Sequence, residues 1–245
     1  MTKPKIVKLD EAVMANQEFQ RNAMAAKLNW LRAGVLGAND GIVSTAGLVM
    51  GVAGATTESS AILIAGVAGL VAGSISMAGG EYTSVSAQKD SEKAALAKER
   101  KELKEDPAGE LRELAWFYEQ KGLSLELATK VATELTARDA LKAHAEAELG
   151  IDSEQHASPG QAALASFIAF AAGSLLPLLA VTGPWTEYRI PVTVIAVVAS
   201  LAITGYVGAK IGGARSTSAI IRNVVVSLLT MGVTYGIGLL VGTAI

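Results

Sequence analysis

Residues 59–80 read SSAILIAGVAGLVAGSISMAGG and carry no charged side chain. A helix needs about 20 predominantly apolar residues to cross the ~30 Å hydrocarbon core of a bilayer, so this stretch predicts a membrane-spanning helix. The sequence continues without a helix breaker through SAQKDSEKAALAKERKELKE, residues 86–105. We therefore expect a single helix that begins in the membrane and ends in a charged region exposed to water.

Four more apolar segments flank this stretch, at residues 31–54, 157–186, 190–209 and 223–245. Each supplies the ~20 apolar residues that a span requires, and 51% of the chain is hydrophobic, which is high for a soluble domain. The link at residues 56–60 is so short that the first two spans must form an antiparallel hairpin. The sequence predicts an all-α polytopic membrane protein with five transmembrane helices and a cytosolic three-helix metal-binding lobe.

Lysine and arginine are unevenly distributed among the segments that join these spans. They gather in the N-terminal region, in residues 88–156 and in the loop with Lys210, Arg215 and Arg222, whereas the other two links hold only Arg189. Because basic loops stay in the cytosol, we expect the N-terminus and residues 88–156 to be cytosolic and the C-terminus to lie outside. The predicted domains are a cytosolic N-terminal tail (1–30), transmembrane helices 1–2 (31–87), a cytosolic helical metal-binding domain (88–156) and transmembrane helices 3–5 (157–245).

The central region, residues 88–156, is also acidic. It contains 16 of the 23 acidic and 11 of the 21 basic residues, which gives a net charge of −5 there and +3 in the rest of the chain. This imbalance favours cationic ligands and argues against nucleic acid as a partner. The chain has no cysteine, so a metal would need oxygen, nitrogen or thioether ligands. Nucleophile triads and nucleotide-binding loops are also missing, and we predict neither enzyme activity nor a resident cofactor.

Helix start and stop signals divide the central region into three predicted helices. Asp106-Pro107 ends the first and begins the second, with aspartate as the N-cap and proline at the first helical position. Gly122 ends the second helix, since glycine is the usual residue after a helix C-terminus. Ser124 caps the third helix, which we expect to run to Leu149.

Carboxylates and one histidine recur at helical spacing in these three helices. The pairs are Glu99 with Glu102, Glu110 with Glu113, and His144 with Glu148. Residues three or four apart share a helix face, so the six side chains would form a cage for a first-row divalent ion. Imidazole together with carboxylate favours Fe2+, Mn2+, Co2+ or Zn2+ over Ca2+ or Mg2+. The alternative is a solvated charged face paired with nearby lysines, and the spacing alone leaves both interpretations open.

Asp40 interrupts the first apolar segment. A carboxylate within a span costs at least ~2.5–3.5 kcal/mol, so its presence predicts a functional site. Asp40 lies about 12 Å along a helix from Arg32, and Met77 on the second span lies four residues inside Glu81, at a comparable depth. Asp40 and Met77 would offer a hard and a soft ligand to an Fe2+-like ion, and Asp40 could exchange that ion for protons. The alternative for Asp40 is a capping role in the NDG triplet, and the role of Glu81 stays open.

Four segments resemble those of a known family. Residues 32–55 read RAGVLGANDGIVSTAGLVMGVAGA, residues 72–92 read AGSISMAGGEYTSVSAQKDSE, residues 102–114 read ELKEDPAGELREL, and residues 139–151 read DALKAHAEAELGI. They resemble the vacuolar iron transporter family, which includes the yeast vacuolar iron/manganese transporter and the nodulin-21-like proteins. The resemblance covers nearly the whole chain from Leu28 onward.

The resemblance implies a homodimer of five-span protomers with the ion pathway at the subunit interface. Members of the family move Fe2+, and often Mn2+, out of the cytosol in exchange for protons. The resemblance places Asp40 and Met77 on the pathway. It makes the matching glutamates metal ligands of the cytosolic lobe: Glu99, Glu102, Glu110, Glu113 and Glu148. Plant members carry two methionines where this chain has His144 and Ala145, so the number and selectivity of its lobe sites stay open.

A second function class also stays open, namely a membrane-anchored iron buffer or a ferroxidase-like protein that acts through the lobe. Di-iron enzymes use a Glu-x-x-His motif on two helices, whereas Leu141 and Ser153 stand three positions before the two histidines, which weighs against an oxidase. We expect divalent metal ions, protons and lipid as partners, with Zn2+ or Co2+ as further ions for the lobe. The membrane would be the plasma (inner) membrane of a prokaryote or a vacuolar-type membrane of a eukaryote.

Overall fold

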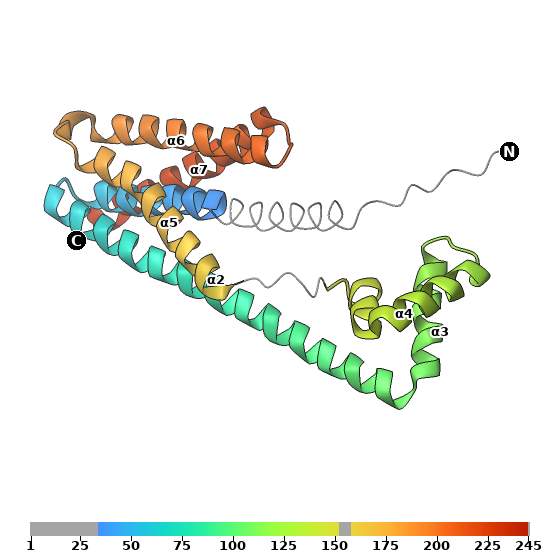
Figure 1. The fold of residues 1–245 in the computed structure, drawn as a ribbon. Coiled ribbons are helices and arrows are strands. Elements are labelled where there is room, and N and C mark those ends of the chain that lie inside the picture. The colour runs from blue at the N-terminus through green and yellow to red at the C-terminus, as the bar shows by residue number, and fades with distance from the viewer. Residues whose placement is uncertain (1–33, 152–157, 245) are drawn as a thin grey trace, which may run out of the picture. The chain divides into compact units, whose positions relative to one another are not determined.

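The computed structural model describes residues 34–151 and 158–244. Within these ranges the secondary structure is helical and contains no strand, which confirms the all-α prediction. The elements in chain order are a first helix (Gly34–Ala55), α2 (Ser59–Glu105), α3 (Pro107–Gln120), α4 (Leu125–Ala147), α5 (Pro159–Thr182), the short 3-10 helix η1 (Thr186–Tyr188), α6 (Arg189–Ile211) and α7 (Ser216–Gly242) (Figure 1). The predicted tail at residues 1–30 lies outside the described residues.

Five helices in the described part of the chain are long and apolar enough to cross a membrane, in agreement with the predicted spans. They are the first helix, α2, α5, α6 together with η1, and α7. Four of these segments have 22 to 27 residues, close to the ~20 that a span requires. α2 has 47 residues, because the charged stretch that follows its apolar part contains no residue that would end a helix before Asp106.

The chain forms two compact units, and α2 contributes residues to both. The first, which we call the membrane unit, comprises Met1–Tyr82 and Pro159–Ile245. The second, which we call the lobe unit, comprises Thr83–Ser158. The cytosolic location of the lobe unit and the exact domain limits drawn from the sequence stay predictions.

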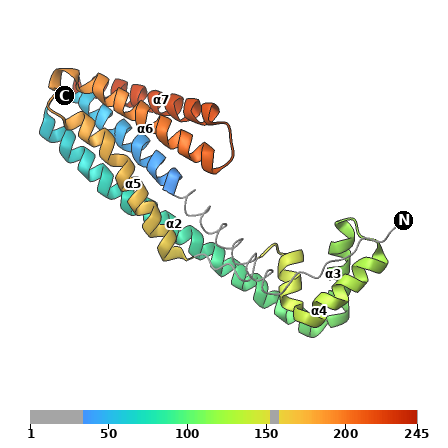
Figure 2. The ribbon, with the colours of Figure 1, turned by 45° about the horizontal axis from the view of Figure 1, so that its top comes forward.

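The first helix lies at the centre of the membrane unit. Ile42 and Met50 are buried in a cluster with side chains of α6 and α7, and Val49 is buried against α2 and α5. Figures 1 and 2 show this helix, in blue, between α6 on one side and α2 with α5 on the other. Four neighbouring helices therefore fix the position of the helix that carries Asp40.

Glycines allow the first helix to approach its neighbours at backbone distance. A side chain at Gly41 would collide with the backbone of α5 at Phe170. A side chain at Gly238 of α7 would likewise collide with the carbonyl group of Gly51. Small residues permit this kind of close contact between membrane helices, so the packing of the unit depends on glycine at both positions.

Two polar side chains connect different elements of the membrane unit. The Ser174 hydroxyl of α5 donates a hydrogen bond to the carbonyl of Gly41 over 3.2 Å. The guanidinium of Arg189, at the start of α6, donates to the carbonyl of Thr57 over 3.2 Å and to the Ser59 hydroxyl over 2.5 Å. Arg189 is only 7% exposed, so its buried hydrogen bonds connect α6 to the link between the first helix and α2.

The lobe unit contains a small apolar core between α3 and α4. Leu114 and Ala115 of α3 are buried against Ala132 and Ala143 of α4. Partly buried side chains surround them, namely Leu111, Tyr118, Leu135 and Ala147. This core holds α3 and α4 together independently of the polar cluster that the same helices share with α2.

The helix ends in the lobe unit follow the sequence signals. Asp106 caps α3, because its carboxylate accepts a hydrogen bond of 2.8 Å from the Gly109 N–H, and Pro107 is the first helical residue. Gly122 follows the C-terminus of α3 with a φ of +95°, a conformation that glycine adopts without steric cost. Ser124 caps α4 through its side chain, as predicted.

α4 differs from the expected regular helix ending at Leu149. The backbone at Asp139 is extended, with φ −161° and ψ 97°, and the helix ends at Ala147. The Asp139 carboxylate accepts a hydrogen bond of 3.0 Å from the Lys142 N–H, as an N-cap residue does. The second part of α4, which carries His144, therefore begins as a separately capped helical segment.

Candidate metal sites

His144 lies at the centre of a carboxylate cluster in the lobe unit. Its Nδ1 atom is 2.9 Å from Glu99 Oε1, 3.4 Å from Glu148 Oε2 and 3.6 Å from Glu110 Oε2. The donor atoms of Glu99, His144 and Glu148 all lie within 4.8 Å of one another. The structure thus brings together four of the six predicted lobe ligands, from α2, α3 and the end of α4.

The centre of this cluster is buried. The side chain of His144 is 0% exposed and that of Glu99 is 3% exposed. Nδ1 of His144 forms a hydrogen bond with the Glu148 carboxylate. Glu99 Oε1 touches the same nitrogen without a hydrogen bond, and neither that oxygen nor His144 Nε2 has a hydrogen-bond partner within the described ranges. Buried polar atoms are nearly always hydrogen-bonded, so the cluster has the donor set of a cation site.

Burial and mutual repulsion change the protonation of the cluster. The pKa of Glu99 is raised to about 7, first by burial and then by the charge of Glu148, while His144 opposes the rise. The pKa of Glu110 is also raised, first by burial and then by the charge of Glu113. Both causes act against the charged form of a carboxylate. A divalent cation held between these groups would offset both effects.

Glu102 and Glu113 are not among the carboxylates that contact His144. Glu102 instead forms an ion pair of 3.0 Å with Lys98, and its side chain is 37% exposed. The Glu102 carboxylate raises the pKa of Lys98. The structure therefore places Glu102 as a partly exposed, paired carboxylate and Glu99 as a buried one, and the role of either as a metal ligand stays a prediction.

Helix ends place the side chains of the cluster. Glu110 lies in the first turn of α3, just after the Asp106 cap, where a carboxylate is favoured by the positive end of the helix dipole. His144 lies in the last turn of α4, and its carbonyl accepts a hydrogen bond of 2.9 Å from the N–H of Glu148 at the helix end. His144 and Glu148 both lie on the short helical segment that begins at the Asp139 cap.

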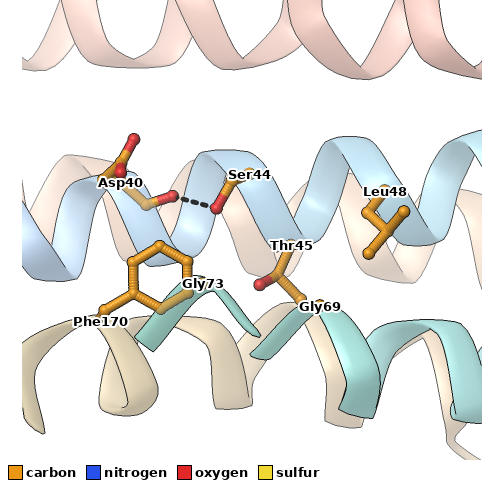
Figure 3. Close-up of a pocket in the computed structure, with 7 residues that line it drawn as sticks. All are labelled: Asp40, Ser44, Thr45, Leu48, Gly69, Gly73 and Phe170. Atoms are coloured by element: carbon orange, nitrogen blue, oxygen red, sulfur yellow. Dashed lines mark hydrogen bonds between the residues drawn. The ribbon is translucent and has the colours of Figure 1, made fainter. Parts of the chain in front are cut away.

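A second candidate site surrounds Asp40 in the membrane unit. A cavity of about 260 Å3 lies between the first helix, α2 and α5 (Figure 3). It is lined by Asp40, Ser44, Thr45, Leu48, Gly69, Gly73 and Phe170. A water molecule occupies about 30 Å3 of the liquid, so the cavity has room for an ion with several waters.

Hydroxyl groups accompany Asp40 in this cavity. Ser44 donates a hydrogen bond of 2.6 Å to the Asp40 backbone carbonyl. The lone pairs of the Ser44 hydroxyl oxygen stay available to bind a cation. Thr45 is 2% exposed, and its hydroxyl has no hydrogen-bond partner among the described residues. Figure 3 shows the Asp40 carboxylate directed away from the Phe170 ring. Asp40 is exposed, so its carboxylate is accessible on the surface of the first helix.

Met77 is half-buried on α2 and is not among the residues that line this cavity. It lies four residues beyond Gly73, which is about one helical turn. A joint site of Asp40 and Met77 therefore stays a prediction. Sequence reasoning missed Ser44, although its spacing of four from Asp40 was a usable signal. It also missed Phe170, which comes from a distant span and has no local signal.

Matches to known proteins extend over both sites. The model of the VIT family matches residues 31–239, which include Asp40 and all the predicted lobe ligands. The chain belongs to the VIT family. It is 45% identical over 215 residues to a "Vacuolar iron transporter" of Acanthamoeba castellanii, across 86% of this chain and 78% of that protein. It is also similar to "Vacuolar iron transporter homolog 5" of Oryza sativa subsp. japonica (38% identical, across 87% of this chain and 81% of that protein) and to "Vacuolar iron transporter homolog 4" of Arabidopsis thaliana (35%, 89% and 86%).

Membership of the VIT family confirms the resemblance seen in the sequence motifs. These relatives are named as transporters and not as enzymes, in line with the missing catalytic motifs. Within residues 34–151 and 158–244 of this VIT family member, a buried group of potential metal ligands surrounds His144, and a separate carboxylate, Asp40, lies in a membrane span.

Proposed function

We propose that this VIT family protein transports Fe2+ out of the cytosol in exchange for protons, with Mn2+ as a second cargo. The relatives named above are iron transporters by name, and the five apolar helices offer a path across a membrane. In this proposal the lobe unit collects the metal, and Asp40 carries it through the membrane unit.

The buried cluster around His144 is the observation that carries the proposal. If His144 were protonated, its single positive charge would balance one of the three carboxylates that contact it. The remaining negative charge lies partly buried, which is costly, so the cluster favours binding a proton at Glu99 or a cation between its carboxylates. A divalent cation supplies the missing charge and a partner for Glu99 Oε1. A purely structural ion pair would not need so many carboxylates around one imidazole.

Asp40 supports the exchange with protons. A carboxylate in a span is costly when it is charged and unpaired, so it favours a state with either a metal ion or a proton bound. Alternating between these two states would couple the movement of Fe2+ to the return of protons. Ser44 and Thr45 contribute hydroxyl oxygens to the cavity that Asp40 also lines, and Met77 would add a thioether ligand.

The exposure of Asp40 also supports a homodimer. Asp40 and Ser44 lie on an exposed face of the first helix, where lipid would otherwise contact a carboxylate. A second copy of the chain over this face would remove that contact and complete an ion pathway. The basic loops favour a cytosolic lobe unit with the C-terminus outside. The names of the relatives favour a vacuolar-type membrane, and the plasma membrane would take its place in a prokaryote.

The proposal is tested by Fe2+ flux into proteoliposomes that contain an Fe2+-sensitive dye and carry a pH gradient. The wild-type chain should load the vesicles and dissipate the gradient as Fe2+ enters, with a slower Mn2+ flux. The Asp40→Ala variant should show no flux above that of empty vesicles. Glu58→Ala is the matched control, because Glu58 is an exposed carboxylate in the link between the first two spans.

Absence of flux in the wild-type chain, or full flux in Asp40→Ala, would contradict the transport mechanism. Metal retained by the chain without flux would support the buffer alternative. Catalytic oxidation of Fe2+ by the intact chain would support the ferroxidase-like alternative.

A further inference from the structure

We infer that His144 sets the metal preference of the lobe unit, which binds one ion through His144 Nδ1 and favours Co2+, Zn2+ and Fe2+ over Mn2+. This inference rests on the proposed role of the lobe unit as a metal-collecting site. His144 stands where the plant members carry methionine. The sequence left the number of lobe sites and their metal selectivity open because of this difference.

The distances from His144 Nδ1 to its neighbours are compatible with one metal ion. With bonds of ~2.1 Å, neighbouring donors of a tetrahedral site lie about 3.4 Å apart. The distances from Nδ1 to the three carboxylate oxygens are 2.9, 3.4 and 3.6 Å. The donor atoms of Glu99, His144 and Glu148 also lie within 4.8 Å of one another. Small side-chain movements could therefore place one ion between these three residues, with Glu110 as a more distant fourth donor.

The two other predicted ligands do not form a second complete set of donors. Glu102 is paired with Lys98, and Glu113 is exposed and absent from the contacts of His144. A second ion would thus have to share the ligands of the first. The geometry consequently favours one ion for each lobe unit.

Nδ1 is the ring nitrogen that faces the carboxylates. Nε2 is buried and has no hydrogen-bond partner in the parts of the chain that are described. A neutral imidazole that binds a metal through Nδ1 carries its proton on Nε2. Because the side chain is 0% exposed, this proton would be shielded from water, which gives the bound state a distinctive spectroscopic signal.

The imidazole is also the group that separates one ion from another. Its three neighbours in the cluster are carboxylates, and oxygen-only sites suit Mn2+ along with Mg2+ and Ca2+. An imidazole nitrogen instead suits Fe2+, Ni2+, Cu2+ and Zn2+. Co2+ lies between Fe2+ and Ni2+ in the order of affinities for such sites, whereas Mn2+ has the lowest affinity. Replacing this nitrogen by oxygen should therefore shift the preference toward Mn2+.

The affinity test uses the full chain in detergent, without a polyhistidine tag and with Asp40→Ala present throughout, so that the lobe unit dominates binding. Co2+ and Mn2+ affinities are measured by equilibrium dialysis at about pH 7.5, where most carboxylates are ionised. His144→Glu should lower the ratio of Co2+ to Mn2+ affinity by about tenfold or more. Glu134→Gln, an exposed carboxylate on α4, should leave the ratio unchanged. A ratio that changes less than about twofold in His144→Glu, or equally in both variants, would overturn the inference.

A second measurement needs no change at His144. The NMR spectrum of the Co2+-loaded chain should show one exchangeable, strongly shifted imidazole proton, from Nε2–H of a ligand bound through Nδ1. The chain has two histidines, so His156→Gln removes the other source and should leave this signal in place. Loss of the signal in His156→Gln, its absence from the wild-type chain, or uptake of two ions by each lobe unit would also overturn the inference.

These binding results can be separated from transport. If wild-type proteoliposomes move no Fe2+ while the affinity ratio shifts as expected, the proposed transport fails and the role of His144 stands. If the vesicles move Fe2+ and the ratio does not shift, the inference about His144 fails by itself.

Discussion

The membrane unit and the lobe unit arrange their polar groups in opposite ways. In the lobe unit, several carboxylates crowd around one buried imidazole. In the membrane unit, one exposed carboxylate shares a cavity with hydroxyl groups and glycines. Many close donors hold an ion tightly, whereas a pathway needs sites weak enough to release it. The difference between the two sites is therefore the one expected of a collector and a conductor in the proposed transport.

The two units also differ in how their packing is achieved. Helices of the membrane unit touch through glycine backbone, as at Gly41 and Gly238. The lobe unit uses a small apolar core and side-chain caps such as Asp106 and Asp139. Changes in side-chain volume should consequently damage the first unit more, and changes in hydrogen bonding should damage the second more.

The largest expected effect is on Co2+ affinity, and it should differ between the buried Glu99 and its more exposed neighbour Glu102. Glu99→Gln removes a charge from the centre of the cluster, and we expect Co2+ affinity to fall by roughly 10–100-fold. Glu102→Gln removes only an exposed ion pair, which contributes little. Equilibrium dialysis on the full chain with Asp40→Ala measures both. Equal losses in the two variants would contradict the division into buried ligand and solvated face.

Acidification should weaken metal binding by the lobe unit. The pKa of Glu99 is about 7, so a metal must displace a proton from this group below that pH. Affinity should fall by up to about tenfold for each pH unit below 7 and should level off above it. Dialysis across this pH range measures the slope, and Glu99→Gln should flatten it. A slope that persists in Glu99→Gln would assign the proton to another group.

The same shift has a consequence for the stability of the metal-free chain. The folded pKa of Glu99 is raised above its ordinary value of 4.5, so the folded state binds the proton more tightly than the unfolded state. The associated stability is present below about pH 4.5 and is lost as the pH rises through about 7. Thermal unfolding followed by circular dichroism should show this decline, and Glu99→Gln should reduce it.

Adding a methyl group at Gly238 in the membrane unit should have a smaller effect, and this effect should be on stability. Gly238→Ala forces α7 away from the carbonyl of Gly51, and overpacking of this kind costs about 1–3 kcal/mol. Gly232→Ala, on the same helix, enters open space and serves as the control. Thermal unfolding in detergent should show a lower midpoint for Gly238→Ala alone, with metal binding by the lobe unit unchanged. Alanine favours a helix more than glycine does, so a similar fall in both variants would contradict a specific close contact at Gly238.

The smallest effect is expected at the break in α4. Asp139→Ala removes the cap of the segment that carries His144, which should cost about 1 kcal/mol and weaken Co2+ binding only severalfold. Asp139→Asn keeps a capping oxygen and should restore both properties. Thermal unfolding and dialysis measure the two effects. If alanine and asparagine behave alike, the side chain of Asp139 does not act as a cap.

Local signals allowed the spans and most helix ends to be predicted from the sequence. An uncharged run such as residues 59–80 specifies a membrane helix by its length alone, and Asp106, Pro107 and Ser124 act within one helical turn. Asp139 also carries a local capping signal. It was not distinguishable from an ordinary exposed residue, because the residues around it favour helix on both sides.

The composition of the two candidate sites could not be predicted in full from residue spacing, because spacing does not show which helices pack against each other. Glu99 and Glu102 share one helix face in the sequence, yet α4 covers Glu99 with His144 and leaves Glu102 exposed. Which of two neighbours becomes buried depends on the packing of another helix. The cavity at Asp40 likewise depends on Phe170, which lies on a different helix. The residue types and part of the grouping in the lobe unit were therefore predictable, whereas the choice of which glutamate is buried and the lining of the Asp40 cavity were not.

The extended residue at Asp139 has a consequence for how the lobe unit tolerates changes in length. The helix restarts at Asp139. The directions in which His144 and Glu148 point around the helix axis are therefore set by their distance in sequence from Asp139, and not from Ser124. A residue inserted between 139 and 144 would rotate both donors by ~100° and point them away from Glu99. The spacing from 139 to 148 is thus set by the two donors, whereas the first half of α4 is held separately, by the packing of Ala132 against α3.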